Sequence, residues 1–311
     1  MYRLWIIGNF IHGSDTEFSY CKDYWWANIL YVNNFVPKMG DKVCIGQSWY
    51  LSNDMQFYVV APIFIILLFR SSLGGLVANV GAIFASLITT AALTYHYKLG
   101  PASIADRNIN DFHILYNKPY IRITSYIVGI LGGWLYWKFG QGLRVSVSRM
   151  SVWKQVMIGA PIWLVTAAVQ YAVVFGLYDD ILLVFTKGKD PSVADSISYQ
   201  MFARLAWGMS LTVQILACQC GLGGFINSLL SWKGWLVLSR LTYAVYLLHF
   251  GMLLILFYEA RHPFYFTPDF NFSILYLGIL MMSYLAAIVL YVTVEQPVAF
   301  LESLAYRKQK K

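Results

Sequence analysis

Residues 49–58, which read Trp-Tyr-Leu-Ser-Asn-Asp-Met-Gln-Phe-Tyr, place polar side chains directly before a long apolar run. A simple membrane anchor has no use for the carboxylate of Asp54 at that place. At the mouth of a cavity this carboxylate could orient a base or bind an acceptor hydroxyl, with Gln56 and Tyr58 lining the same mouth. The structural alternative is helix capping, because Ser, Asn and Asp are good N-caps and an aspartate complements the helix dipole.

Arg122 opens a later apolar run, at the end of the sequence Asn-Lys-Pro-Tyr-Ile-Arg in residues 117–122. In the structural interpretation, its long side chain extends to the membrane interface. In the functional interpretation, its planar fork binds an anionic group such as a phosphate or a carboxylate. Arg204 and Gln214 lie in a further apolar run, and we interpret both as weaker candidates that pair between helices.

His249 lies inside another apolar run, where an ionisable side chain indicates a function by default. Tyr243 and Tyr246 precede it at three-residue spacing, which places them on its helix face. His249 is either a packing residue that bonds to a neighbour or a group that orients or deprotonates an acceptor. We predict that it converges with Asp54 and Arg122 on one polar cavity, with Tyr246 in the wall, because unpaired charges in lipid are costly.

These residues need a membrane-embedded scaffold. Of the 311 residues, 59% are hydrophobic and 12% are charged, whereas soluble domains carry about 25% charged residues. Backbone polar groups must pair within a helix in lipid, so the apolar runs predict an all-α, polytopic transmembrane bundle of about seven spans. A loop of residues 1–50 is expected before the transmembrane domain 51–294, and a basic tail, 295–311, after it. The expected spans are 51–69, 73–95, 121–139, 152–178, 199–218, 235–258 and 272–294.

The charges predict which ends of the spans face the cytosol. With residues 1–50 outside, the inner side has the denser Lys and Arg and holds only two of the 15 acidic residues, as the positive-inside rule requires. Cys21 and Cys44 then face an oxidising compartment, and we predict a disulfide between them. Cys218 and Cys220 face the cytosol and are expected to stay reduced.

Several classes of function are not indicated. The five histidines are not spaced as a metal-ligand set, so we assign no metal site. Nucleophile-elbow, phosphate-loop and dinucleotide motifs are absent from the sequence. Positive charge follows the membrane edges rather than one soluble face, which argues against a nucleic-acid partner.

Taken in order, these motifs resemble the membrane acyltransferase 3 family, most closely its animal branch called nose resistant to fluoxetine. The family has Trp-Ser/Tyr-Leu-x-x-Glu/Asp-x-Gln-Phe-Tyr where this chain has residues 49–58. It has Lys-Pro-x-x-Arg at 118–122 and Ser/Thr-Tyr-x-x-Tyr-Leu-x-His at 242–249. Its domain ends in Glu-x-Pro, as here at Glu295 and Pro297, which we expect to have a structural role because proline ends a helix.

The resemblance implies transfer of an acyl group to a hydroxyl or amine, from an acyl donor such as acyl-CoA and with no bound cofactor. It implies catalytic roles for Asp54, Arg122 and His249. The other motif positions are expected to bind substrate: Trp49, Gln56, Tyr58, Tyr243 and Tyr246. The family's partners are membrane lipids and a small-molecule or lipid acceptor.

The resemblance also implies an incomplete catalytic set. The family depends on a histidine in an earlier membrane helix, and nothing in this chain matches it. We therefore expect a C-terminal part of a longer protein, with little turnover of its own. The alternative function is non-enzymatic uptake or transport of lipids or small hydrophobic molecules.

Overall fold

A computed structural model describes residues 20–37, 44–101, 112–178, 180, 192–259 and 270–309. The chain divides into two compact units, Met1–Ser228 (unit 1) and Leu229–Lys311 (unit 2), and each is described by itself. The regular elements among the described residues are all helices, so the predicted all-α class is confirmed. The sequence-based boundaries at residues 50 and 294 stay predictions, and residues 1–19 and 38–43 of the expected first loop lie outside the described ranges.

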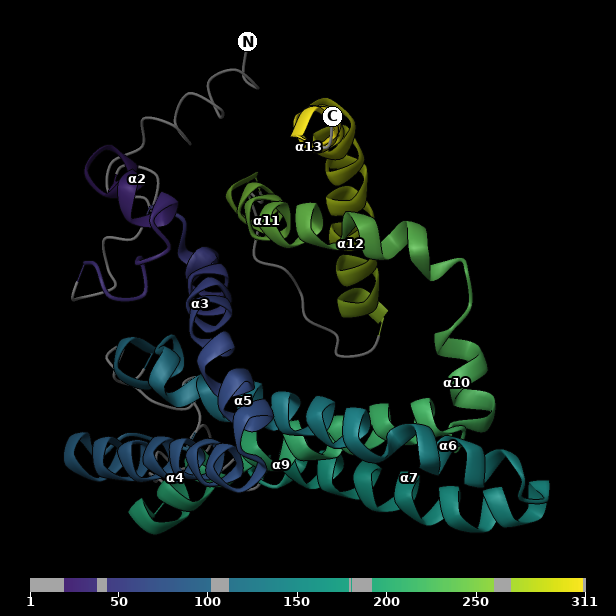
Figure 1. The fold of residues 1–311 in the computed structure, drawn as a ribbon. Helices are drawn as coiled ribbons and strands as arrows, with labels where there is room; N and C mark the ends of the chain where they lie inside the picture. The colour runs from purple at the N-terminus through teal and green to yellow at the C-terminus, as the bar shows by residue number, and fades with distance from the viewer. Residues whose placement is uncertain are drawn as a thin grey trace. The chain divides into compact units, whose positions relative to one another are not determined.

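In unit 1 the long helices α3, α4 and α7 pack around α5 and α9 (Figure 1). Helix α5 packs against α3, α4 and α9, and α7 packs on α9. In unit 2, α11 packs against α12. The helices are α2 (Cys21–Ile29), α3 (Trp49–Arg70), α4 (Ser72–Tyr97), α5 (Pro119–Leu135), α6 (Gln141–Ser148), α7 (Val152–Phe175), α9 (Val193–Cys220), α10 (Gly224–Leu230), α11 (Trp235–Glu259), α12 (Phe270–Leu290) and α13 (Gln296–Gln309).

Six helices in the described part of the chain are long and apolar enough to cross a membrane. They correspond to all the expected spans but the third, which is α5. Helix α5 starts at Pro119, carries Arg122, and is rich in glycine and hydroxyl side chains. Because it packs against three other helices, it does not need apolar residues on every face. The multi-pass membrane architecture is thus as predicted, with six spans meeting the length and hydropathy criteria.

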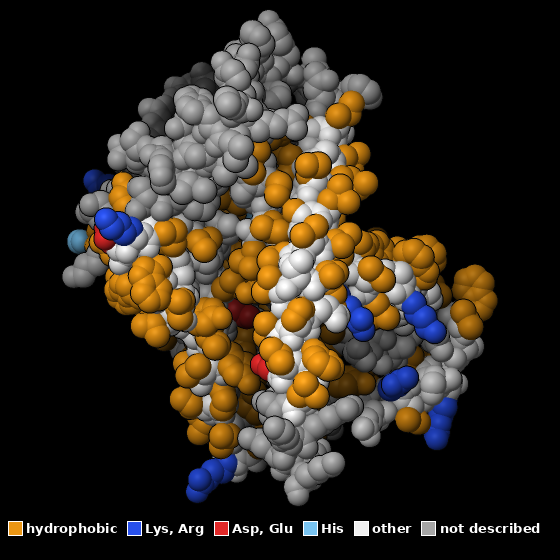
Figure 2. Space-filling view, turned by 90° about the horizontal axis from the view of Figure 1, so that it is seen from above, with side chains coloured by type: hydrophobic (Ala, Val, Ile, Leu, Met, Phe, Trp, Pro, Cys, Tyr) orange, Lys and Arg blue, Asp and Glu red, His pale blue; other side chains and the backbone are white. Residues whose placement is uncertain are grey.

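The surface of the molecule also fits a membrane. Hydrophobic side chains cover much of the described face in Figure 2. Large apolar residues on α7 face outward, for example Trp153 at 80% exposure and Leu164 at 70%. Apolar surface on this scale would be unfavourable in water and is favourable against lipid.

Helices α5 and α9 approach each other closely at two glycines. A Cβ atom on Gly132 would lie 2.2 Å from the methyl of Thr212, and one on Gly208 would lie 3.2 Å from Ser125. These contacts ascend together along both helices, so α5 and α9 run in the same direction. Small residues at such positions let two membrane helices meet backbone to backbone.

The expectation that Pro297 ends a helix is wrong. A π-helical turn, Tyr291–Glu295, joins α12 to α13, and Pro297 is the second residue of α13. Proline is tolerated in the first turn of a helix, where its missing N–H removes no intrahelical bond. Glu295 and Pro297 therefore mark a change of helical winding inside a longer helical stretch.

Candidate functional site

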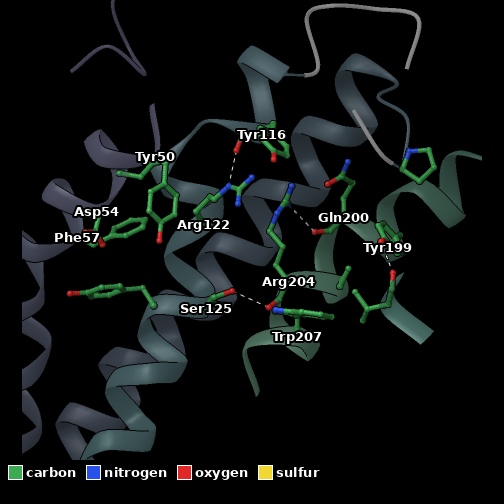
Figure 3. A pocket seen from close by; sticks show the side chains of 15 residues that line it. Tyr50, Asp54, Phe57, Tyr116, Arg122, Ser125, Tyr199, Gln200, Arg204 and Trp207 are labelled. Atoms are coloured by element: carbon green, nitrogen blue, oxygen red, sulfur yellow. Dashed lines mark hydrogen bonds between the residues drawn. The ribbon is translucent and has the colours of Figure 1, made fainter. Parts of the chain in front are cut away.

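Unit 1 contains a pocket of about 860 Å³ lined by residues of α3, α5, α7 and α9 (Figure 3). Its size is typical of sites for small molecules. Much of the wall is aromatic or apolar, and the charged side chains among the described residues that line it are Asp54, Arg122 and Arg204. The pocket thus brings together two of the three residues predicted to carry chemistry.

Asp54 does not cap a helix, so the capping alternative is wrong for this residue. Helix α3 begins at Trp49, after a 3-10 turn, and its N-cap is Ser48, whose side chain makes no capping bond. Asp54 consequently lies in the second turn and is exposed. Tyr50, Asn53 and Phe57 line the pocket beside it, at the three- and four-residue spacing of one helix face.

The neighbours of Asp54 that were predicted to bind substrate face other surroundings. Gln56 donates to the carbonyl of Tyr31 (2.8 Å) and exchanges hydrogen bonds with Asn34. Tyr58 is 72% exposed and lies outside the pocket lining. Trp49 packs its ring on the guanidinium of Arg122, at 4.7 Å from the centroid. Trp49 therefore shapes the site through Arg122, whereas Gln56 ties α3 to the preceding segment.

A buried network of amides and hydroxyls holds the start of α3. Asn53, only 2% exposed, donates to the carbonyl of Asn117 (3.0 Å) and accepts from Asn34 (2.8 Å). Lys118 donates to the carbonyl of Asn34, and burial lowers the pKa of this lysine. Because Asn117 and Lys118 directly precede α5, the network fixes α3 relative to α5.

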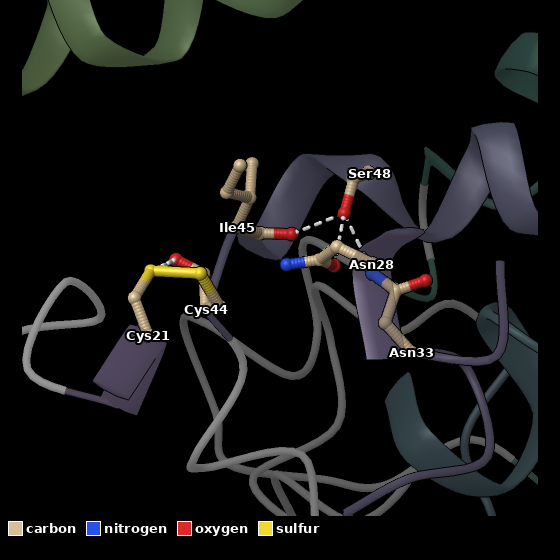
Figure 4. The surroundings of a disulfide bond; sticks show 6 residues. All are labelled: Cys21, Asn28, Asn33, Cys44, Ile45 and Ser48. Carbon is tan, nitrogen blue, oxygen red and sulfur yellow. Dashed lines mark hydrogen bonds between the residues drawn. A yellow bond between two sulfur atoms is a disulfide. The ribbon is translucent and has the colours of Figure 1, made fainter. Parts of the chain in front are cut away.

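A disulfide joins Cys21 and Cys44 (Figure 4), the pairing predicted from the sequence. It connects the start of α2 to the segment that enters α3. Ser48, next along the chain, accepts from Asn33 (2.6 Å) and donates to Asn28 (2.9 Å). The segment before α3 is therefore bound to α2 and to the residues that follow α2, both covalently and through hydrogen bonds.

Arg122 is held in place on three sides. Its Nε donates to the carbonyl of Tyr116 (2.8 Å), and its guanidinium lies over the rings of Tyr116 and Trp49 at 4.4 and 4.7 Å from their centroids. Contact with aromatic rings restrains a guanidinium and leaves its charge in place. Among the described residues no ion pair joins Arg122 to Asp54. The geometry favours the anion-binding interpretation over extension to the interface.

Arg204, which the sequence indicates only as a weaker candidate that pairs between helices, lines the pocket. It lies about 17 Å along α9 from Val193, and its Nη1 donates to the carbonyl of Gln200 (3.4 Å). Its own carbonyl accepts from Ser125 of α5 (3.0 Å), and its side chain lines the pocket with Arg122. The signal that marks it is an arginine deep inside an apolar run.

His249 belongs to unit 2, so its predicted convergence with the pocket of unit 1 stays a prediction. The histidine is half-buried in α11, and its Nδ1 lies 2.6 Å from the carbonyl of Tyr246. A carbonyl can only accept, so in this contact Nδ1 is the donor. Tyr246 packs on the imidazole at 5.7 Å between centroids, and Tyr243 is half exposed.

No group of three His, Cys, Asp or Glu side chains placed to hold a metal occurs in the described part of the chain. The arrangement in unit 1 combines a carboxylate that can accept a hydrogen bond with two guanidinium groups that can bind an anion. It is therefore suited to bind an anionic or amphiphilic molecule whose apolar part lies against the aromatic wall.

Comparison with known proteins gives two relatives, whereas no family model and no solved structure matches. Over 303 residues the chain is 30% identical to Nose resistant to fluoxetine protein 6 of Caenorhabditis elegans. The aligned region covers 93% of this chain and 35% of that protein. Over 127 residues it is 28% identical to Regulator of hypoxia-inducible factor 1 of the same organism, 35% of this chain and 25% of that one. The chain spans about a third of the length of the first relative. The similarity extends over 93% of the residues of this chain and supports its assignment to the nose resistant to fluoxetine branch.

Proposed function

We propose that this protein is an acyltransferase-like membrane protein, whose unit 1 pocket binds the substrates of transfer to a hydroxyl or an amine. One observation carries the proposal: Asp54 of α3 and Arg122 of α5 line the same pocket. Both residues stand at motif positions that resemble the membrane acyltransferase 3 family. Similarity to Nose resistant to fluoxetine protein 6 over 93% of this chain supports the same class of protein.

In the proposed reaction, the acceptor oxygen or nitrogen bonds to the acyl carbonyl carbon, and the bond from that carbon to the leaving group of the donor breaks. The acceptor loses one proton and the leaving group gains one. Asp54 accepts a hydrogen bond from the acceptor, and Arg122 holds an anionic group of a substrate. On the sequence motif alone, His249 would orient or deprotonate the acceptor, whereas the principal base of the family is an earlier histidine that nothing in this chain matches.

Non-enzymatic uptake of lipids or small hydrophobic molecules is the second candidate. It is favoured by the composition of the pocket wall. Histidine, cysteine and lysine do not occur among the described residues that line it, and Asp54 is its carboxylate. A wall of this kind can bind an amphiphile, and it offers few groups that exchange protons near neutral pH.

The two candidates differ in whether the acyl group changes its covalent partner. The whole chain is reconstituted in membranes with an acyl donor labelled in the acyl group, and product is followed in single turnovers because slow turnover is expected. We expect Asp54→Asn to lower product formation by about tenfold or more. Asp195→Asn, at an exposed position outside the pocket, serves as the matched control.

Each outcome selects a candidate. Labelled acceptor that depends on Asp54 supports acyl transfer. Retention of the unchanged labelled lipid, lost in Arg122→Gln, supports uptake. If the protein neither transfers the label nor retains it through Arg122, the pocket is not a substrate site and both candidates fail.

A further inference from the structure

Among the described residues that line the unit 1 pocket, positive charge exceeds negative charge. These residues include Arg122, Arg204 and one carboxylate, Asp54. Two cations that face one partly buried space repel each other more strongly than they would in water. A bound anion relieves this repulsion, so the pocket is electrostatically complementary to a negatively charged group.

The packing of α5 and α9 places the two arginines at one level. The helices run in the same direction, with Ser125 opposite the carbonyl of Arg204 (3.0 Å). Helical side chains lean toward the N-terminus of their helix, and Arg204 does so, because its Nη1 donates to the Gln200 carbonyl. Arg122 starts one turn before Ser125. In Figure 3 the guanidinium ends of Arg122 and Arg204 accordingly point toward each other.

Two forks from two helices favour a tetrahedral anion over a planar one. A carboxylate presents two oxygens in one plane and is satisfied by a single bidentate arginine. A phosphate presents oxygens in several directions and can accept from both guanidinium groups at once. The contacts of Arg122 with the adjacent rings of Trp49 and Tyr116 restrain one of these forks before a ligand arrives.

The rest of the wall indicates what the phosphate is attached to. Phe57, Tyr126 and Trp207 form aromatic parts of the lining, which match an acyl chain. Asp54 repels a second anionic group and favours a hydroxyl or ammonium group near the phosphate.

We propose that the pocket binds a phosphate-bearing amphiphile, with its phosphate between Arg122 and Arg204 and its acyl part against the aromatic wall. This inference rests on the proposed function, because it takes the pocket to be the substrate site. The phosphate belongs either to a membrane phospholipid or to a soluble phosphate compound that carries an acyl group.

The test compares two photoreactive lipids in nanodiscs that hold the whole chain. One is phosphatidic acid and the other is diacylglycerol with the same photoreactive acyl chain, so that they differ in the phosphate alone. Labelled peptides are mapped by mass spectrometry. We expect phosphatidic acid to label α3, α5 and α9 at the pocket roughly tenfold more than diacylglycerol. Arg122→Gln and Arg204→Gln should each reduce this labelling to the diacylglycerol level.

Arg70→Gln is the matched control, because Arg70 is an exposed arginine at the end of α3 outside the pocket. Arg204→Lys keeps the charge without the planar fork and should give intermediate labelling. Each variant is compared at equal amounts of folded protein, measured by thermal unfolding. A variant that lowers only the folded fraction is thereby separated from one that loses the ligand.

Competition identifies the source of the phosphate. Coenzyme A or glycerol 3-phosphate that suppresses pocket labelling indicates a soluble phosphate compound, and labelling unaffected by either indicates the phospholipid. Equal labelling by the two lipids would overturn the phosphate inference while the pocket stays a substrate site. Absence of any pocket labelling, by either lipid, would overturn the proposed function as well.

Discussion

Helix α9 carries two polar residues with different surroundings. Gln214 contacts α7, and Arg204 lies on the side of α5. Gln214 donates to Thr166 (3.0 Å) and exchanges hydrogen bonds with Gln170 (3.1 and 3.3 Å), so the neutral groups satisfy each other. Arg204 shares a pocket with Arg122, which has the same charge. The first contact joins two helices, and the second prepares a space for a third molecule. The role of a polar residue in a membrane helix thus depends on the charge and the hydrogen-bonding groups of its neighbours.

The largest effect on stability and ligand binding is expected for a substitution at the close approach of α5 and α9. Leucine at Gly132 would collide with Thr212, whose Oγ1 is held by the Gly208 carbonyl (2.8 Å). Gly132→Leu should lower the free energy of unfolding by about 1–3 kcal/mol and should reduce ligand binding by separating Arg122 from Arg204. Gly133→Leu is the control, since a Cβ there meets nothing within 4 Å. Equal behaviour of the two variants in thermal unfolding would contradict the close approach.

Adjacent residues of α3 allow a second comparison. Asn53 is buried with two hydrogen-bond partners, whereas Asp54 is exposed. Asn53→Leu should therefore lower the free energy of unfolding by about 1–3 kcal/mol, because it leaves buried groups unpaired. Asp54→Leu should change it by less than about 0.5 kcal/mol. Denaturant titration in mild detergent measures both, and a larger cost for Asp54 would assign that carboxylate a structural role.

A third comparison, within α9, concerns a moderate effect on stability. Gln214→Leu should lower the free energy of unfolding by roughly 0.6 to 1.7 kcal/mol, as expected for hydrogen bonds between membrane helices. It should leave lipid labelling unchanged. Arg204→Leu should abolish lipid labelling, because one of the two guanidinium groups is lost. Loss of labelling in Gln214→Leu would show that the two contacts are not independent.

Much of the fold could be predicted from the sequence, because apolar runs and backbone pairing in lipid leave few alternatives. The start of α3 could not, since a 3-10 turn before Trp49 moves Asp54 out of the cap position. The continuation of helix past Pro297 depends on a π-helical turn, which has no simple sequence signal. Gln214 forms the interhelical pair that was predicted, with Gln170.

Less of the candidate site could be predicted, because the site depends on side-chain contacts between helices. Asp54 and Arg122 stand at motif positions and line one pocket. The place of Arg204 beside Arg122 follows from the register of α5 on α9, which is set by side-chain packing and cannot be derived from either helix alone. Gln56 and Tyr58 share the motif of Asp54 but not its helix face, because a helix turns about 100° at each residue.

The central claim is that Arg122 and Arg204 hold one anionic group together, and a double-mutant cycle on ligand binding tests it most directly. Binding of phosphatidic acid is measured for the wild-type chain, Arg122→Gln, Arg204→Gln and the double variant. Two residues that bind the same group are coupled, so the double variant should bind at least about fivefold more tightly than the product of the two single losses predicts. Single losses that simply multiply would show that the two arginines act on separate groups, and would contradict the account.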